Sequence, residues 1–399
     1  MGAIAETAGS GLAEQMTKVL LVAPPASGGI ARHVLSLARG LDRSQFEICV
    51  ACPSAGSIAE EAASLGIAVF PVGIAPTPSP VKAMSAALAL SRVIARGGFH
   101  LVHAHSFSAS LIAGLAREFT SWPILVSSIH NFLTGPNRLG IQGAVVRMIA
   151  RKADRIVTVS QALHAVFADC RGAAEKLVTI PNGIDLGEVP DDSMRDRLRA
   201  DLDIPADALV AGVVARLAPQ KGVLEFLDVA ARVARRVPQA RFVIVGDGPL
   251  RERIAARAQS LGLGERLVLA GFRADARRLM AAFDLAVIPS LSEGFSIVAV
   301  EAMAAARPVA AYATGGLPEV VADGRTGLLA PERDADALAA AIEALLTDPV
   351  RAREMGEAGR ERTRECFSLS AMIERIQNLY ADLVRSHLVG QPGQGSKRP

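Results

Sequence analysis

The sequence predicts an α/β protein of two domains, each a doubly wound parallel sheet covered by helices. Half of the 399 residues are apolar, which is enough to fill a core in each of two domains. Aromatic residues are few, whereas Ala, Val, Leu and Gly are abundant, as is typical of parallel sheets between helices. Short apolar runs alternate with segments of helical periodicity, and this alternation indicates repeated βα units.

Charge and cysteine content exclude several classes of protein. The formal net charge of +3 is too small to indicate a nucleic-acid partner, although residues 1–185 hold 15 Lys and Arg against 11 Asp and Glu. The four cysteines are too few for a disulfide framework. Cys49 and Cys52 form an isolated C-x-x-C in a strand-like run, where strand alternation would point the thiols to opposite faces, so we expect neither metal nor redox chemistry there.

The ends of the sequence give no membrane or export signal. No apolar run is long enough to span a bilayer, and residues 1–16 lack the basic and apolar regions of a signal peptide. Glu6 stands where a myristoylation signal requires Ser or Thr. We therefore expect a flexible leader over 1–16, a disordered polar tail over 389–399 and a soluble protein of the reducing cytoplasm.

The N-terminal half follows the βα pattern from residue 18 onward. Gly28 and Gly29 lie between the first strand and the first helix, where glycine permits a ligand to approach the backbone, although an ordinary tight turn needs the same residues. The loop lacks the G-x-G-x-x-G of dinucleotide-binding proteins. The predicted strands are 18–23, 46–51, 68–72, 101–103 and 124–128, and the clearest helices are 58–65 and 81–95.

Three histidines stand at predicted strand ends, where ligands of doubly wound sheets bind. They are His103, His105 and His130. A structural role is the common alternative for each of them. No carboxylate neighbours them at the spacing of a metal site, so we expect no zinc.

A basic helix is predicted over 139–155. Arg147, Arg151, Lys152 and Arg155 lie away from its apolar positions. A solvated face and a surface that docks on anionic lipid are both consistent with this pattern.

A domain boundary is predicted near Asp185. A strand over 156–159, a helix over 162–167 capped by Ser160 and the string P-N-G-I-D precede a charged stretch over 188–207. We expect an N-terminal domain over 17–185, a C-terminal domain over 186–366 and a last helix near 367–388.

The second domain opens with a strand over 209–215 that leads to Arg216 and Lys221, five positions apart. Two cations at a strand end suit a diphosphate, although such a pair is also common on surfaces. Gly246 follows another strand, 242–245, and Arg273 follows a third, 267–270. Two D-x-D strings, at 201–203 and 334–336, resemble metal-binding motifs, but they lie away from these strand ends and we interpret them as chance.

The stretch 289–320 gives the most specific prediction. An apolar run over 283–288 leads through a polar turn to a helix beginning near Phe295 or Ser296. The backbone amides of Ser296, Ile297 and Val298 would then form an anion site at a helix N-terminus. Glu293 and Glu301 flank this site, and carboxylates beside an anion suit hydroxyl groups, so the pattern indicates a sugar nucleotide. A simple helix cap is the alternative for Glu293.

These motifs together resemble the retaining glycosyltransferases of family 4, over roughly residues 18–380. The residues that carry the resemblance are E-G-F-S-I-V-A-V-E from Glu293 to Glu301, G-G-L-P-E, R-x-x-x-x-K-G at Arg216 and P-N-G-I-D. The resemblance implies a GT-B fold, in which two Rossmann-like domains face a cleft: an N-terminal acceptor domain and a C-terminal nucleotide-sugar domain. It also implies that the last helix, near 367–388, packs back on the N-terminal domain. It also implies roles for particular residues: catalysis by His130, Glu293, Arg216 and Lys221; donor binding by Gly28, Gly29, Gly246, Arg273, Gly294, Phe295, Ser296, Ile297, Val298 and Glu301; and an acceptor side with His103 and His105.

The activity implied is metal-independent hexosyl transfer with retention from a nucleoside diphosphate sugar to a hydroxyl acceptor. UDP is the commonest donor nucleotide of the family and GDP the next, with no separate cofactor. The acceptor is expected to be lipid-linked, a polysaccharide or a small molecule, and peripheral contact of the basic N-terminal domain with the inner membrane face is a further expectation. An epimerase or phosphorylase on the same scaffold, and a non-catalytic sugar-nucleotide binding protein, remain the alternatives.

Overall fold

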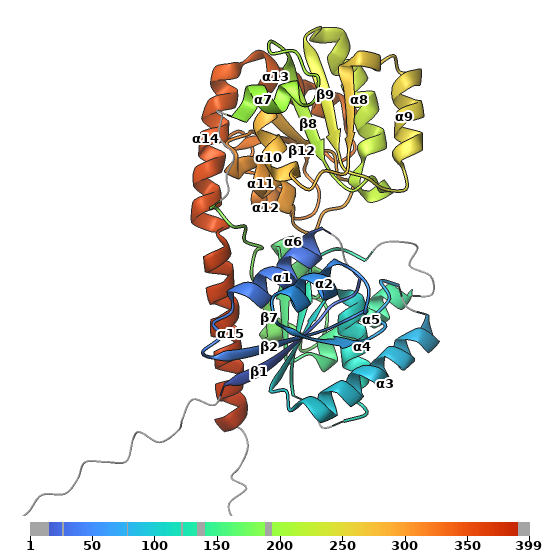
Figure 1. Ribbon diagram of the computed structural model, residues 1–399, viewed down its shortest axis with the longest axis vertical. Helices are drawn as coiled ribbons and strands as arrows, with labels where there is room; N and C mark the ends of the chain where they lie inside the picture. Colours follow the sequence, from blue (N-terminus) through green and yellow to red (C-terminus); the bar gives the residue numbers. More distant parts are fainter. Residues whose placement is uncertain are drawn as a thin grey trace, which may run out of the picture. The chain divides into compact units, whose positions relative to one another are not determined.

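The computed structural model describes residues 16–25, 28–77, 79–120, 123–133, 140–187 and 194–389 (Figure 1). The chain forms two compact units. Unit 1 comprises Met1–Ser128, Gly143–Ile156 and Gln377–Pro399, and unit 2 comprises Ile129–Gln142 and Val157–Ile376. The functional domain boundary near Asp185 stays a prediction, and the leader and the tail lie outside the described residues, except for Met16 and Val389.

A seven-stranded sheet has the order β3-β2-β1-β4-β5-β6-β7. The pairs of β1 with β2 and with β4, of β2 with β3 and of β4 with β5 are parallel. The order reverses between β1 and β4, which defines the switch point where doubly wound sheets bind ligands. The strands are β1 (Thr17–Val22), β2 (Phe46–Cys52), β3 (Ala68–Pro71), β4 (Leu101–His105), β5 (Ile124–Ile129), β6 (Arg155–Thr158) and β7 (Leu177–Thr179).

Helix α4 (Phe107–Ala116) is buried along most of its length, whereas α3 (Pro80–Gly97) buries one apolar face. Helices α3 and α4 contact one another, and their buried faces form one core with β1, β4 and β5 around Leu90, Ile112 and Val102. Ser79 and Ser106 cap the two helices by accepting from Lys82 N and Ala109 N. The helices are α1 (Gly29–Gly40), α2 (Ser57–Ser64), α3 (Pro80–Gly97), α4 (Phe107–Ala116) and α5 (Ile141–Lys152).

The basic helix is shorter than predicted. Helix α5 ends at Lys152, and Arg155 begins strand β6, so the prediction of helix through Arg155 was wrong at this end. The reason is Asp154, whose carboxylate accepts from Leu125 N at 2.8 Å and thereby places the following residues beside β5. Leu139 lies outside the described residues.

A six-stranded parallel sheet forms the core of unit 2, in the order β10-β9-β8-β11-β12-β13. The order reverses between β8 and β11, so this sheet has its own switch point. The strands are β8 (Leu209–Val214), β9 (Ala240–Val245), β10 (Leu267–Gly271), β11 (Leu285–Ile288), β12 (Val309–Tyr312) and β13 (Gly327–Ala330).

Helices cover both faces of this second sheet. Helices α8 (Val223–Arg236), α9 (Arg251–Ser260) and α13 (Ala335–Thr347) share a core with the strands, centred on Phe226, Phe242 and Ile342. Helix α11 (Ile297–Ala304) contacts α14 (Pro349–Cys366), and both lie across the sheet from α8 and α9 in Figure 1. The shorter helices of unit 2 are α6 (Gln161–Ala165), α7 (Arg195–Ala200), α10 (Ala276–Leu279) and α12 (Leu317–Val320).

Two short motifs resolve into helix caps. Ser160 caps α6 by accepting from Leu163 N at 3.2 Å, as the sequence predicts. Asp334, in the second D-x-D string, caps α13 by accepting from Asp336 N and Ala337 N at 3.1 and 2.9 Å. Its interpretation as a chance match to a metal motif thus gains a structural reason.

The last helix, α15 (Leu369–Val389), belongs to unit 1 from Gln377 onward. In that part Tyr380 is fully buried, and its ring lies edge-on to Phe46 with centroids 5.9 Å apart. The C-terminal half of α15 therefore contributes to the core of unit 1.

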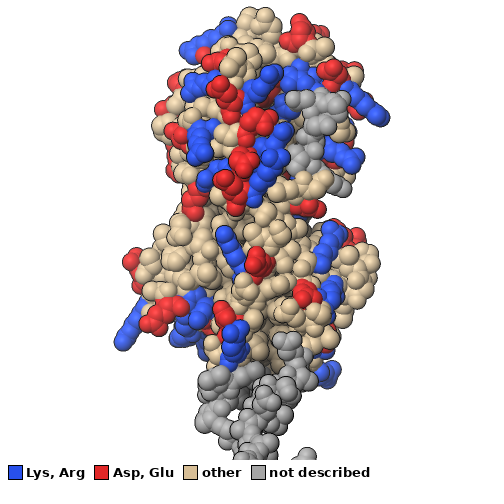
Figure 2. Space-filling model, turned by 90° about the vertical axis from the view of Figure 1, so that its left-hand side faces the viewer, with Lys and Arg blue, Asp and Glu red and all other residues tan. Residues whose placement is uncertain are grey.

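Charges are mixed on the surface. On the face that Figure 2 shows, Lys and Arg are interspersed with Asp and Glu among the described residues. Near the basic helix, Arg117 pairs with Asp154 and Lys152 pairs with Glu118. Among the described residues, no helix combines the length and apolar character that crossing a membrane requires.

Candidate active site

The loops that follow β8 and β11 flank the switch point of the second sheet. Arg216 comes two residues after β8 and is exposed, and Lys221 ends a short 3-10 turn, Pro219–Lys221. Glu293 lies five residues after β11. Because β8 and β11 are adjacent parallel strands, their carboxyl ends bring these two loops together.

Lys221 and Glu293 form an ion pair, with Nζ 2.6 Å from Oε2. The Lys221 side chain is 29% exposed, whereas that of Glu293 is 6% exposed. The carboxylate is thus held inside unit 2 while its cation reaches solvent. This pair joins two of the residues that the sequence assigns to catalysis, although the sequence does not predict that they touch.

Helix α11 begins close to this pair in sequence. Ser296 is its N-cap, and its hydroxyl accepts from Ala299 N at 3.3 Å. The amides of Ile297 and Val298 lie in the first turn, where the helix supplies no carbonyl partner and the helix dipole favours an anion. Phe295 is buried against Phe367, with ring centroids 5.6 Å apart, and this contact fixes the entry of the chain into the helix.

Glu301 is the fifth residue of α11 and is 5% exposed. It lies one helical turn beyond Ile297, so its carboxylate is further along the helix than the amides of the first turn. A buried carboxylate in an otherwise apolar helix is unusual and requires polar partners. This position agrees with a binding role for Glu301, which stays a prediction.

Glycines hold the loops of this site against one another. A Cβ at Gly222 would lie 1.9 Å from Pro289 O, and one at Gly315 would lie 2.0 Å from Glu293 O. Gly316 N also donates to Glu293 O at 2.9 Å. Such close contacts between main chains leave no room for a side chain, so the backbone of Glu293 is fixed by its neighbours.

Gly222→Ala is expected to destabilise the protein strongly, because Gly222 has a φ of 62° and its Cβ would overlap a carbonyl of the next loop. Gly262→Ala is the matched control, since Gly262 has a φ of 67° but open space around its Cβ. We expect the control to lose about 1 kcal/mol, as for an ordinary left-handed residue, and Gly222→Ala to lose more. Urea unfolding measures both, and equal losses would contradict the close contact.

Gly246 and Arg273, which the resemblance assigns to binding of the nucleotide sugar, lie at other strand ends of the second sheet. A Cβ at Gly246 would lie 1.9 Å from Ala215 O, and its φ of 139° is open only to glycine. Arg273 binds Asp275 with two hydrogen bonds of 2.8 and 2.7 Å, which raise the pKa of Arg273 and lower that of Asp275. Because the Arg273 guanidinium is paired with Asp275, we expect a contact with the nucleotide sugar to involve the backbone of Arg273.

His130 follows β5, is 5% exposed and belongs to unit 2. Its carbonyl oxygen would lie 2.2 Å from a Cβ at Gly294. Gly294 of the E-G-F-S motif therefore packs on the backbone of His130. Because Gly294 directly follows Glu293, the backbones of His130 and Glu293 are close in space. The sequence assigns these three residues to one site without predicting this contact.

His103 lies in unit 1 and is fully buried. Its Nδ1 is 2.5 Å from the Tyr380 hydroxyl, and its Nε2 is 2.6 Å from Ser128 Oγ. Burial lowers the pKa of His103 well below its usual value and raises that of Tyr380, so both are neutral. With both ring nitrogens engaged inside unit 1, His103 is better placed to orient its neighbours than to contact an acceptor.

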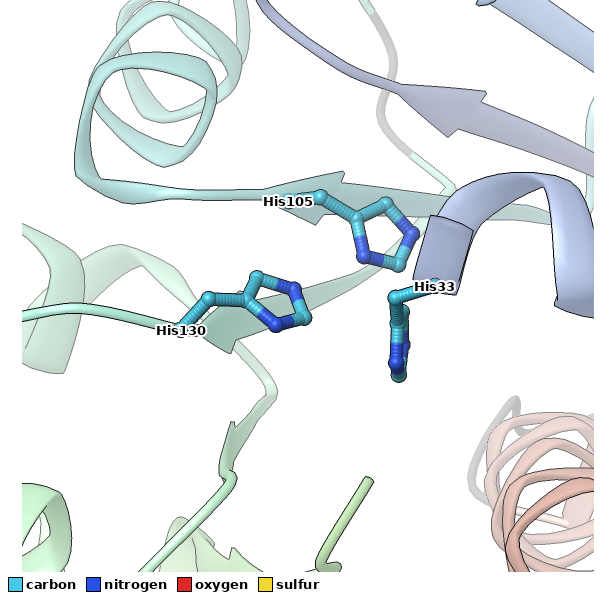
Figure 3. A group of neighbouring side chains, drawn as sticks. All are labelled: His33, His105 and His130. Carbon is cyan, nitrogen blue, oxygen red and sulfur yellow. The ribbon is translucent and has the colours of Figure 1, made fainter. Parts of the chain in front are cut away.

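His105 and His33 lie beside one another at the switch point of the first sheet (Figure 3). Their ring centroids are 5.3 Å apart, and the His105 ring is also 4.0 Å from that of His103. His33 was not predicted as a site residue, although its position between Ile30 and Val34 on the apolar face of α1 could have indicated burial. Gly28 has a φ of 78° and precedes α1, so the turn requires a glycine, whereas Gly29 is the exposed first residue of the helix.

Glu319, the last residue of the G-G-L-P-E motif, has a definite partner in the structure. Its carboxylate accepts from Gln161 N at 2.7 Å and from Ala162 N at 2.8 Å, and so binds the first turn of α6. Arg362 donates to the carbonyls of Glu319 and Val320. These bonds fix α12, which directly follows Gly315 and Gly316.

Two doubly wound parallel sheets, one with cations and a helix N-terminus at its switch point, define a protein of the GT-B class. The sequence profile of "Glycosyl transferases group 1" matches residues 194–362, and that of "Glycosyltransferase Family 4" matches residues 27–188. The chain is 33% identical over 356 residues to the GDP-mannose-dependent alpha-(1-6)-phosphatidylinositol monomannoside mannosyltransferase of Mycolicibacterium smegmatis, covering 84% of this chain and 90% of the relative. The chain therefore belongs to glycosyltransferase family 4, and the predicted fold class is confirmed.

Two further proteins illustrate the range of the similarity. The UDP-Gal:alpha-D-GlcNAc-diphosphoundecaprenol alpha-1,3-galactosyltransferase of Escherichia coli is 26% identical over 369 residues, which are 90% of this chain and 95% of the relative. The crystal structure of Anabaena HepE in complex with UDP-glucose has a TM-score of 0.79 at 25% identity and covers 92% of this chain and 99% of that one.

Proposed function

We propose that this glycosyltransferase moves a hexose from a nucleoside diphosphate sugar to an acceptor hydroxyl and retains the anomeric configuration. The observation that carries the proposal is the position of Lys221 and of the first turn of α11 in the loops around the switch point of the second sheet. A flexible cation and unpaired amides suit a diphosphate, because both supply positive charge without a metal ion. Arg216, exposed two residues after the adjoining strand, supplies a second cation.

The diphosphate is the leaving group of the reaction. As the bond between the anomeric carbon and the diphosphate oxygen breaks, negative charge builds on the diphosphate, and Lys221, Arg216 and the α11 amides stabilise it. Glu301 binds ribose hydroxyls, and Glu293 and His130 position the sugar. The acceptor oxygen attacks from the face that the diphosphate leaves, and its proton passes to a diphosphate oxygen, so no covalent nucleophile is required.

The donor is a UDP-hexose or a GDP-hexose. The relatives support both, since the Mycolicibacterium enzyme is described as GDP-mannose-dependent and the Escherichia enzyme as using UDP-Gal. Both of these names include a lipid acceptor, so a lipid-linked acceptor and peripheral contact with an anionic membrane are part of the proposal. Sedimentation with phosphatidylglycerol vesicles tests the contact, and a protein that stays in the supernatant at low salt would contradict it.

Thermal unfolding with a panel of nucleotide sugars tests the donor. We expect one UDP-sugar or GDP-sugar to stabilise the folded protein by about 2.7 kcal/mol at a hundred times its dissociation constant, and adenosine diphosphate sugars to do less. With that donor and an acceptor, NMR of the anomeric proton should show the configuration of the donor in the product. An inverted product would contradict retention, and no stabilisation by any nucleotide sugar would contradict the proposed function.

A further inference from the structure

The cation proposed for the diphosphate already has an anionic partner. Lys221 Nζ lies 2.6 Å from Glu293 Oε2, and the carboxylate is 6% exposed. A buried carboxylate requires such a partner, because an isolated charge is costly to remove from water. A diphosphate that binds Lys221 must therefore either share the ammonium with Glu293 or replace Glu293 as its partner.

The two partners differ in their freedom to move. The backbone of Glu293 is held by Gly315 and by the hydrogen bond from Gly316 N to Glu293 O. The Lys221 side chain is 29% exposed, and its long stem and freely rotating ammonium allow it to change partner. When Lys221 exchanges Glu293 for another anion, we expect the ammonium to move and Glu293 to stay in place.

Sharing is unfavourable for electrostatic reasons. A carboxylate within reach of the same ammonium lies close to the diphosphate, and like charges at that distance repel one another strongly where solvent is excluded. Sugar hydroxyls are donors that a carboxylate can accept in place of the ammonium. An incoming sugar nucleotide can thus supply both a new anion for Lys221 and new donors for Glu293.

We propose that the Lys221–Glu293 ion pair is a counter-ion switch that couples diphosphate binding to sugar binding. In the empty site Glu293 neutralises Lys221. When a nucleoside diphosphate sugar binds, its diphosphate takes over Lys221, and the released carboxylate accepts from the sugar hydroxyls. The inference rests on the proposed function, because it requires that Lys221 bind the diphosphate. It adds that Glu293 opposes binding of a nucleoside diphosphate that carries no sugar.

The variant Glu293→Gln distinguishes two hypotheses: that Glu293 competes with the diphosphate for Lys221, and that Glu293 only binds the sugar. UDP and GDP serve as probes because they contain the diphosphate but no sugar, and isothermal titration measures their affinity. We expect whichever nucleotide binds the unaltered protein to bind Glu293→Gln about three- to tenfold more tightly, since residues in contact commonly couple to this extent. Glu293→Asp withdraws the carboxylate by one methylene and should tighten binding in the same direction.

Two controls identify the cause of any change. The gain must disappear in the double variant Lys221→Ala/Glu293→Gln, because the switch acts only through the lysine. Asp228→Asn breaks another ion pair of unit 2, with Arg257 at 2.6 Å, and removes the same charge away from the site. It should leave the affinity unchanged.

The outcomes are distinct. If UDP or GDP binds the unaltered protein and Glu293→Gln binds it equally or more weakly, or if the gain persists without Lys221, the switch is overturned while the proposed function stands. If neither nucleotide binds the unaltered protein or Glu293→Gln, and no UDP-sugar or GDP-sugar stabilises the unaltered protein, the proposed function fails, and the switch fails with it.

Discussion

Lys221→Ala is expected to lower kcat about 100- to 1,000-fold with the donor identified by thermal unfolding, at saturating donor and acceptor. The expectation follows from the removal of a charged donor that acts mainly on the departing diphosphate, because groups that stabilise charge only in the transition state commonly contribute this much. Steady-state kinetics measures the change.

Folding must be shown to be intact for that result to have meaning. Loss of Lys221 leaves the buried Glu293 carboxylate without this cation and should lower the stability, so the assay is run well below the unfolding temperature of the variant, where its circular dichroism spectrum should be unchanged. Lys221→Arg keeps the charge and serves as the control, and it should recover part of the lost activity although its fork of donors differs from an ammonium. A folded Lys221→Ala protein with unchanged kcat would contradict the role of Lys221.

Arg199→Ala is expected to destabilise the protein by about 3 to 5 kcal/mol, the usual cost of removing one partner of a buried ion pair. The guanidinium of Arg199 is 2% exposed and donates to the carbonyls of Ala282, Ala206 and Ala208 and to Asp284 Oδ2. Asp284 Oδ2 also accepts from Val210 N at 2.7 Å, at the start of β8. Loss of Arg199 would leave the three carbonyls without this donor and would remove one of the two arginines that pair with Asp284, the other being Arg195.

Urea unfolding measures this loss. Arg236→Ala is the matched control, because Arg236 pairs with Glu343 at 3.1 Å but is 66% exposed, and exposed pairs contribute about 1 kcal/mol or less. Burial also lowers the pKa of Arg199, yet neighbouring Asp284 favours its charged form. A loss for Arg199→Ala as small as that for the control would show that the buried network contributes little.

The sequence was sufficient to predict β8, β9, β10 and β11 of the second sheet and the loops after β8 and β11, because each relies on local pattern, whereas β12 and β13 were not predicted. Apolar runs define β8 and β11, and Ser296 caps α11 where the helix was expected to begin. The glycines of the motifs lie where loops pack main chain on main chain, and such contacts demand glycine whatever surrounds them.

Contacts between residues far apart in the chain could not be predicted in this way. Lys221 and Glu293 are separated by 72 positions, and Glu319 and Gln161 by 158. Arg199 lies in the charged stretch that the sequence predicts as a boundary, and its burial depends on acceptors that the fold supplies, among them Asp284, 85 positions away. Charge pattern alone cannot identify which arginine of such a stretch is buried, because burial depends on the partner that the fold supplies.

A crystal structure of the protein with UDP or GDP tests most directly whether Lys221 and the first turn of α11 bind the diphosphate. We expect the diphosphate within hydrogen-bonding distance of Lys221 Nζ and of the Ile297 and Val298 amides. A diphosphate bound away from the first turn of α11, with no contact to Lys221, would contradict the account.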